Sequence, residues 1–240
     1  MNHFKGKDPL SHLKEARLKG KIAASEVHGV EMPGHLSAGA DAAKEGAFLL
    51  LLLWTLFGGH PSHFFMLIFL IALGVWKVGR SAILGWGRLD RLHRLIEEER
   101  YEIEHHRPQE KEELRALYRA KGFSGKLLDE AVEVLMADDN RLLQVMLEEE
   151  LGLNLESEEH PLKQAAGALV GVFCSGLIVS VGIFWLPPWG TPVCAFLVVI
   201  VAAALVAKFE KGQILPSIIW NLAIAGLSTG AAYFLAKVLL

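Results

Sequence analysis

Long apolar stretches are the feature that most constrains what this chain can fold into. One runs over residues 64–84, and three more occupy residues 165–186, 192–207 and 214–239. A helix of about 20 apolar residues crosses the hydrocarbon core of a bilayer. Hydrophobic residues make up 52% of the 240 residues and charged residues only 21%, which is too apolar for an ordinary soluble domain. The sequence therefore predicts an all-helical protein that crosses a membrane several times.

A fifth span is predicted upstream of these, in a stretch that carries three charged residues. Residues 46–59 are apolar but too short to cross a bilayer, so we expect the helix to begin near Leu36. This extension places Asp41, Lys44 and Glu45 at or inside the membrane boundary. Ionisable residues inside a membrane are costly unless they have a role or a partner, and Lys44 can supply a partner.

The later spans carry a few polar residues and two pairs of glycines. Lys77 and Arg80 fall late in the second span, where we expect them near the water interface or snorkelling toward it. Asn221 in the last span is expected to hydrogen-bond a neighbouring helix. Glycines four residues apart favour close helix packing, within or between subunits. The two pairs are Gly167 with Gly171 and Gly226 with Gly230.

The two hydrophobic blocks are separated by an acidic segment that cannot lie in a bilayer. Of the 27 Asp and Glu residues, 20 fall between residues 88 and 160. Apolar residues recur there at helical spacing, and Pro108, Gly122 and Gly152 mark helix ends. We expect the second span to continue into a helix over residues 88–106. Shorter helices are predicted over residues 110–121, 126–136 and 139–151.

Lysine and arginine set the expected orientation, because they are retained on the cytoplasmic side of short loops. The N-terminal arm and the loops after the second and fourth spans are basic, whereas residues 58–62 and 187–191 contain no Lys or Arg. We therefore expect a cytosolic N-terminus and a cytosolic acidic domain, in a bacterial inner membrane or an organelle membrane. The predicted parts are an N-terminal arm at 1–35, two spans at 36–87, the acidic domain at 88–160 and three spans at 161–240.

Pairs of side chains in the acidic domain have the spacing of a single helix face. The pairs are Glu99 with Glu102, Glu110 with Glu113, and Met146 with Glu150. Clustered carboxylate oxygens suit divalent cations, and a thioether favours a transition metal over magnesium or calcium. By spacing alone, a solvated acidic face is the commoner explanation of such a charge run.

Three local strings and the order of the parts give the chain a family resemblance. The strings are EEERYEIE at residues 97–104, PQEKEELRALYRAKGF at 108–123 and VMLEEELGL at 145–153. With two spans, an acidic helical insertion and three further spans, the sequence resembles the vacuolar iron transporter family. The resemblance implies a cytosolic metal-binding domain with six ligand residues. These are Glu99, Glu102, Glu110, Glu113, Met146 and Glu150.

The same resemblance implies transport, and no enzyme motif appears in the sequence. It implies export of Fe²⁺, or of Mn²⁺, from the cytosol in exchange for protons, by a homodimer whose pathway lies between the subunits. Asp41 and Glu45 are the nearest match to the part of the first span that lines this pathway. The expected partners are divalent metal ions, protons, the lipid bilayer and a second copy of the chain. A net charge of only -3 argues for no nucleic-acid partner, and no organic cofactor is expected.

The chain departs from the family pattern at three places. Leu147 follows Met146 where members carry a second Met, and Ala42 follows Asp41 where members carry Gly. No Met lies late in the second span, where members often have one. Transport is therefore a less direct inference than metal binding.

Two alternative functions remain open from the sequence. A metal sensor or storage protein would keep the Glu and Met cluster but would need no ionisable residue in the membrane. A membrane di-iron oxidase would use Glu102 and His105 together, as one Glu-x-x-His unit. Substitution of Asp41 tests the first alternative, and oxygen consumption with Fe²⁺ tests the second.

Overall fold

The computed structural model describes residues 11, 14, 17–18, 32–153 and 159–239, which form helices and turns with no strand among them. The predicted N-terminal arm at residues 1–35 lies almost entirely outside this described part. The chain divides into two compact units. The acidic unit comprises Met1–Ser25 and Gly87–Glu158, and the membrane unit comprises Glu26–Trp86 and Glu159–Leu240.

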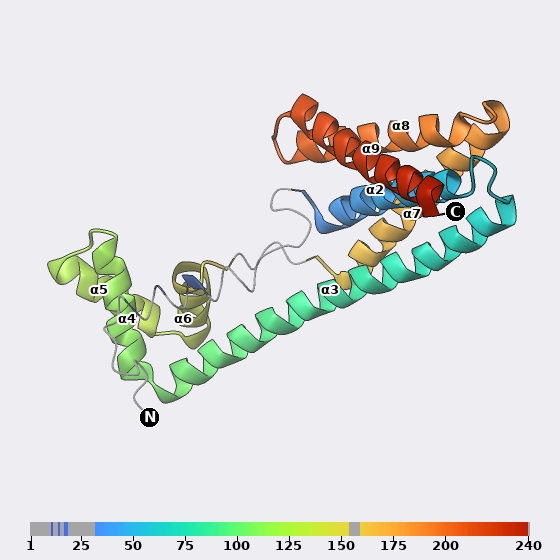
Figure 1. Cartoon of the computed structure of the whole chain (residues 1–240). Coiled ribbons are helices and arrows are strands. Elements are labelled where there is room, and N and C mark those ends of the chain that lie inside the picture. Colours follow the sequence, from blue (N-terminus) through green and yellow to red (C-terminus); the bar gives the residue numbers. More distant parts are fainter. Residues whose placement is uncertain (1–10, 12–13, 15–16, 19–31, 154–158, 240) are drawn as a thin grey trace. The chain divides into compact units, whose positions relative to one another are not determined.

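Four of the described helices are long and apolar enough to cross a membrane (Figure 1). They are α3 (His63–His105), α7 (Pro161–Trp185), α8 (Gly190–Phe209) and α9 (Ile214–Leu239). Each corresponds to one of the four apolar stretches named above; α7 ends one residue before its stretch does, and α9 has the predicted bounds. The prediction that the second span runs on into a helix of the acidic segment is also confirmed, because α3 is a single 43-residue helix.

The stretch predicted as the first span forms helix α2 (Gly34–Leu56), which has 23 residues. Its length is enough to cross a bilayer. It is not among the four apolar helices, because three charged residues lie in its first half. They are Asp41, Lys44 and Glu45.

Helices α2 and α7 pack with their backbones in close contact. A Cβ atom added at Gly167 would overlap the backbone carbonyl of His35, and one added at Gly171 would overlap that of Gly39. Small buried residues continue this contact, including Ala38, Ala42 and Ala168. The predicted close packing at the first glycine pair is therefore confirmed, and it occurs within one chain. Helices α8 and α9 complete the packing of the membrane unit (Figure 1).

The beginnings of α2 and α7 are joined by a carboxylate that the sequence did not single out. The Oε2 atom of Glu159 accepts a hydrogen bond of 2.8 Å from the backbone N–H of His35, and its Oε1 atom pairs with the His35 ring. The Nζ atom of Lys163 lies 3.3 Å from the same Oε1 atom. Because backbone N–H groups in the first turn of a helix have no partner within the helix, Glu159 satisfies one of those of α2.

The acidic unit is built from the end of α3 and a set of short helices. These are α4 (Arg107–Ala120), α5 (Gly125–Met136), α6 (Asp139–Val145) and the π-helical turn η1 (Met146–Glu150). Gly122 follows α4 with a φ of 99°, and Gly152 follows η1 with a φ of 66°. Glycine adopts these left-handed conformations without a steric penalty, so the two predicted helix ends are confirmed.

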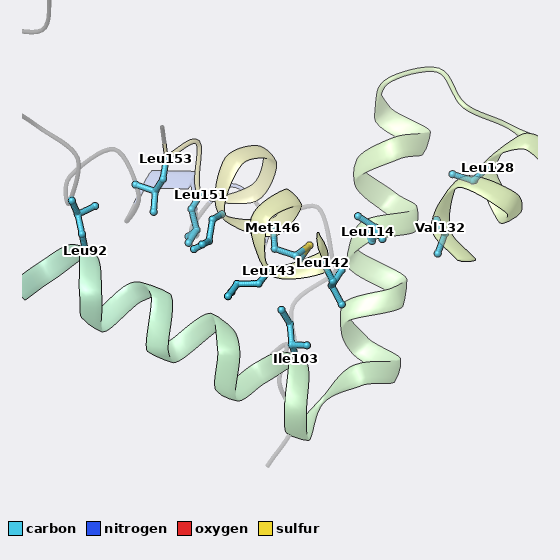
Figure 2. Packing of buried hydrophobic residues seen from close by; sticks show 11 residues of the cluster. Leu92, Ile103, Leu114, Leu128, Val132, Leu142, Leu143, Met146, Leu151 and Leu153 are labelled. Atoms are coloured by element: carbon cyan, nitrogen blue, oxygen red, sulfur yellow. The ribbon is translucent and has the colours of Figure 1, made fainter. Parts of the chain in front are cut away.

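The prediction of one regular helix over residues 139–151 was wrong in its second half. The backbone widens into η1 after Val145, and the N–H of Leu151 bonds the carbonyl of Met146 at 3.2 Å. Isolated π-helical turns are rare and are frequent at functional sites. Figure 2 shows the apolar core to which this turn belongs, with side chains contributed by α3, α4, α5 and α6.

Candidate metal centre

Three carboxylates from three different elements converge inside the acidic unit. Glu99 lies on α3, Glu110 on α4 and Glu150 on η1, and each offers one oxygen atom within 4.8 Å of the others. Their side chains are almost wholly buried, with exposed fractions of 4%, 0% and 3%. Acidic residues are rarely buried without a cation or a proton, so this group differs from a solvated acidic face.

Two further predicted ligands lie beside this trio. Glu113, one turn after Glu110 on α4, is buried and forms a side-chain hydrogen bond with Glu150. Glu102 is partly exposed, and its charge acts on the buried carboxyls of Glu99 and Glu110. The structure therefore brings all five predicted glutamates into one electrostatic group, with three of them close enough to share an ion.

Met146, the sixth predicted ligand, occupies the first position of η1. Its side chain is fully buried in the apolar core of the unit (Figure 2). Glu150 occupies the last position of the same turn, so η1 carries both residues into the interior of the unit. Leu147, which stands where family members carry a second Met, is also buried in this core.

Burial is the main cause of large pKa shifts in the cluster. It raises the pKa of Glu99 from 4.5 to about 8, and the charge of Glu102 adds to the effect. Burial and the neighbouring carboxylates raise the pKa of Glu110 and of Glu113 to about 9. The same causes raise the pKa of Glu150 to about 10. At neutral pH the metal-free cluster is therefore largely protonated, and a bound divalent cation would replace those protons.

The hydrogen bonding of Glu99 also fits a site for a cation. Its Oε1 atom is buried, and no group in the described part of the chain forms a hydrogen bond with it. A buried acceptor without a partner is costly, whereas carboxylate oxygens are common ligands of divalent cations. Glu98, the preceding residue on α3, is exposed. The helix thus separates two adjacent glutamates into one buried and one solvated side chain.

The di-iron alternative is not supported by the placement of His105. Its ring is exposed, stacks on Tyr101 with the centroids 4.0 Å apart, and has its Nδ1 atom 2.9 Å from the Tyr101 carbonyl oxygen. Among the described residues, His105 does not belong to the carboxylate group. Glu102 and His105 are therefore not brought together with these three carboxylates as one metal-ligand group in the described part of the chain.

A second group of ionisable residues lies in the membrane unit. Asp41 and Glu45 line a cavity of about 270 Å³ between α2, α8 and α9, together with Lys44, Asn221 and Ser228. The amide of Asn221 donates a 2.8 Å hydrogen bond to the Ser217 carbonyl of its own helix. The predicted bond from Asn221 to a neighbouring helix is not seen among the described residues, and its side chain lines the cavity.

Each carboxylate of this cavity has a lysine partner. Lys44 Nζ lies 2.8 Å from an oxygen of Asp41, and Lys77 Nζ lies 2.8 Å from an oxygen of Glu45. Lys77 is buried against neighbouring helices, so the predicted snorkelling of its side chain toward water is not observed, and its level near the interface stays a prediction. Sequence reasoning missed this pair because the two residues lie on different helices, 32 positions apart.

Comparison with known protein families places the chain in a defined group. Residues 88–237 match the sequence model of the VIT family. The matched segment is more than half of the chain. It begins at residue 88 within α3 and includes the short helices of the acidic unit, α7, α8 and nearly all of α9, but not α2 or the apolar part of α3. No curated protein matches the sequence.

Proposed function

We propose a function from one premise: the chain belongs to the VIT family, the vacuolar iron transporters. It is an integral membrane protein of a family of divalent metal transporters. We infer that it moves Fe²⁺ or Mn²⁺ out of the cytosol in exchange for protons. The acidic unit is the cytosolic metal-binding domain of this transporter, and the membrane unit holds the pathway.

The observation that carries the proposal is the buried trio of Glu99, Glu110 and Glu150. Three carboxylates within 4.8 Å suit a divalent cation that takes oxygen ligands. The thioether of Met146 on the same turn as Glu150 would add a soft ligand and favour a transition metal over Mg²⁺. The types of these ligands do not identify the metal as Fe²⁺ or Mn²⁺, because the affinity of such a site follows the general affinity order of divalent first-row metals.

Proton exchange follows from the chemistry of the same groups. A carboxyl must lose its proton to bind a metal ion, so each metal that binds the cluster releases protons. Ionisable residues within membrane helices mark ion pathways. Asp41 and Glu45 in the cavity of the membrane unit are therefore proposed as the transport residues. This assigns α2 as a fifth span, beside the four apolar helices.

The proposal also includes the orientation of the chain in the membrane and its assembly with a second copy. The distribution of Lys and Arg between loops favours a cytosolic N-terminus and a cytosolic acidic unit, in a bacterial inner membrane or an organelle membrane. The proposed assembly is a homodimer. A Cβ atom at Gly226 or Gly230 of α9 would meet no described atom within 4 Å, so this pair of glycines is open to a second copy of the chain.

Uptake of metal into proteoliposomes with an imposed proton gradient tests the proposal. The native chain is compared with Asp41→Asn, with Glu99→Gln and with the matched control Glu98→Gln. We expect gradient-dependent uptake of Fe²⁺ by the native chain and by Glu98→Gln, and its loss in Asp41→Asn. If neither the native chain nor any variant takes up metal while the acidic unit still binds it, the chain is a sensor or storage protein instead.

A further inference from the structure

The buried Lys77 side chain is the feature of the membrane unit that metal binding alone does not explain. It lies on the apolar part of α3 and is 5% exposed, and its ammonium group is 2.8 Å from Glu45 of α2. An ammonium ion within a membrane span is costly and needs a partner. In the described part of the chain, Glu45 is the acidic partner of Lys77.

The surroundings of Lys77 leave little room for water. A space of only about 10 Å³ separates it from neighbours on α2 and α7, among them Ala38 and Ala168. A water molecule needs about this volume or more. Ser81, one turn further along α3, is buried, and its Oγ atom has no hydrogen-bond partner among the described residues. The Lys77 side chain is thus packed among its neighbours, and its ammonium group pairs with Glu45, whose own side chain is 51% exposed.

The lysine partners of Asp41 and Glu45 differ in their burial and in the helix they come from. Lys44 has a side chain that is 21% exposed and pairs with Asp41 on its own helix. Lys77 has a side chain that is 6% exposed and reaches across from another helix. Each of the two carboxylates is thus paired with an ammonium group, so a cation that enters the cavity finds the negative charge of both carboxylates already balanced. The Lys44 side chain is therefore the more exposed of the two, and the Lys77 side chain is the more buried.

We propose that Lys77 is a tethered counter-cation that occupies Glu45 whenever no metal is bound there. This inference rests on the proposed transport function and on Glu45 as a pathway residue. A divalent ion gains twice the Coulomb attraction of a monovalent ion at the same distance, so it can displace the ammonium where Na⁺ cannot. When the ion leaves, the ammonium returns to Glu45. Lys77 thereby excludes monovalent cations, weakens metal binding and speeds metal release.

Kinetics of Mn²⁺ uptake into proteoliposomes test this role. The variants are Lys77→Gln, which removes the charge, Lys77→Arg, which keeps it, and Arg80→Gln, which removes an exposed charge one turn away on α3. We expect Lys77→Gln to lower KM by about tenfold or more and to lower the maximal rate, because the ion binds more tightly and leaves more slowly. We expect Lys77→Arg and Arg80→Gln to retain the native KM.

Competition by Na⁺ gives a second readout, in which the native chain and each active variant are compared with and without Na⁺. Uptake of Mn²⁺ by the native chain should be insensitive to Na⁺, and uptake by Lys77→Gln should be inhibited by it. The proposal is overturned if Na⁺ competes in the native chain, or if KM in Lys77→Gln is unchanged or raised. Loss of uptake in Lys77→Gln without tighter Mn²⁺ binding would also overturn it. The transport function itself fails only if the native chain takes up no metal.

Discussion

Glu150 donates a side-chain hydrogen bond to Glu113 inside the acidic unit, although the two residues lie on different helices. Two carboxyl groups can share such a bond only while one of them keeps its proton. The bond accordingly raises the pKa of Glu150 and acts to lower that of Glu113, against a larger effect of burial. In the metal-free cluster, this hydrogen bond therefore lasts only while one of the two carboxyl groups stays protonated.

The metal-free acidic unit should lose stability as the pH rises. An unfolded chain releases the protons of these glutamates near pH 4.5, whereas the folded chain keeps them up to about pH 8 to 10. Between these limits the folded state binds more protons than the unfolded state, so the free energy of unfolding falls as the pH rises. The slope is about 1.4 kcal/mol per pH unit for each proton that only the folded state retains.

Hydrogen exchange of the full chain in detergent, followed by mass spectrometry, measures this effect. Protection in residues 87–153 should fall between pH 6 and pH 9, after correction for the intrinsic exchange rate. Saturating Mn²⁺ should remove the decrease, because the ion replaces the protons. Protection that is independent of pH without metal would show that the glutamates are already ionised.

Glu99→Gln and Glu98→Gln should separate a metal ligand from a solvated charge. The residues are adjacent on α3, but Glu99 is buried and Glu98 is exposed. We expect Glu99→Gln to weaken Mn²⁺ binding by about 10- to 100-fold. It should also stabilise the metal-free unit, because one crowded acid is removed. Calorimetry measures the Mn²⁺ affinity, and thermal melting measures the stability of the metal-free unit. An equal loss of affinity in Glu98→Gln would indicate that Mn²⁺ binds a diffuse acidic surface.

Met146→Leu should test the thioether as a ligand. Leucine has a similar volume, so we expect the fold to lose less than about 1.5 kcal/mol. The sulfur atom is removed, and the preference of the unit for Co²⁺ or Fe²⁺ over Mg²⁺ should shrink. Competition binding with these ions measures the change. An unaltered preference would assign Met146 to the apolar core alone.

Gly171→Ala should disrupt the contact between α2 and α7. The added methyl group would overlap the backbone carbonyl of Gly39, and a backbone atom cannot move aside as a side chain can. We expect a loss of about 1 to 3 kcal/mol, seen as a lower melting temperature in detergent. Gly79→Ala on α3 is the matched control, since its methyl group meets no described atom within 4 Å. Equal melting temperatures would contradict the close packing.

The apolar helices could be predicted from the sequence because a bilayer fixes their length. Helix α9 runs over Ile214–Leu239 as predicted, and α3 continues past the membrane stretch as its apolar spacing indicates. Helix spacing names the candidate ligands only as pairs, and the set of six comes from the family resemblance. Which glutamate of Glu98 and Glu99 is buried depends on how α3 packs with α4 and η1, and spacing along one helix does not contain that information.

Two features of the sites lay beyond sequence reasoning for physical reasons. The π-helical turn η1 shares its apolar spacing with a regular helix, so the extra residue in the turn leaves no local signal. The pair of Lys77 and Glu45 depends on the placement of α3 beside α2. A lysine near the end of a span usually snorkels to water, and the sequence alone does not reveal that Lys77 is buried.

Simultaneous recording of metal and proton fluxes in one vesicle preparation tests the central claim most directly. Proteoliposomes that contain the native chain and a pH-sensitive dye are given Fe²⁺ outside and an acidic interior. The account predicts that Fe²⁺ enters only as protons leave, and that both fluxes stop in Asp41→Asn. Fe²⁺ entry without proton efflux, or no entry by a chain whose acidic unit binds the metal, would contradict it.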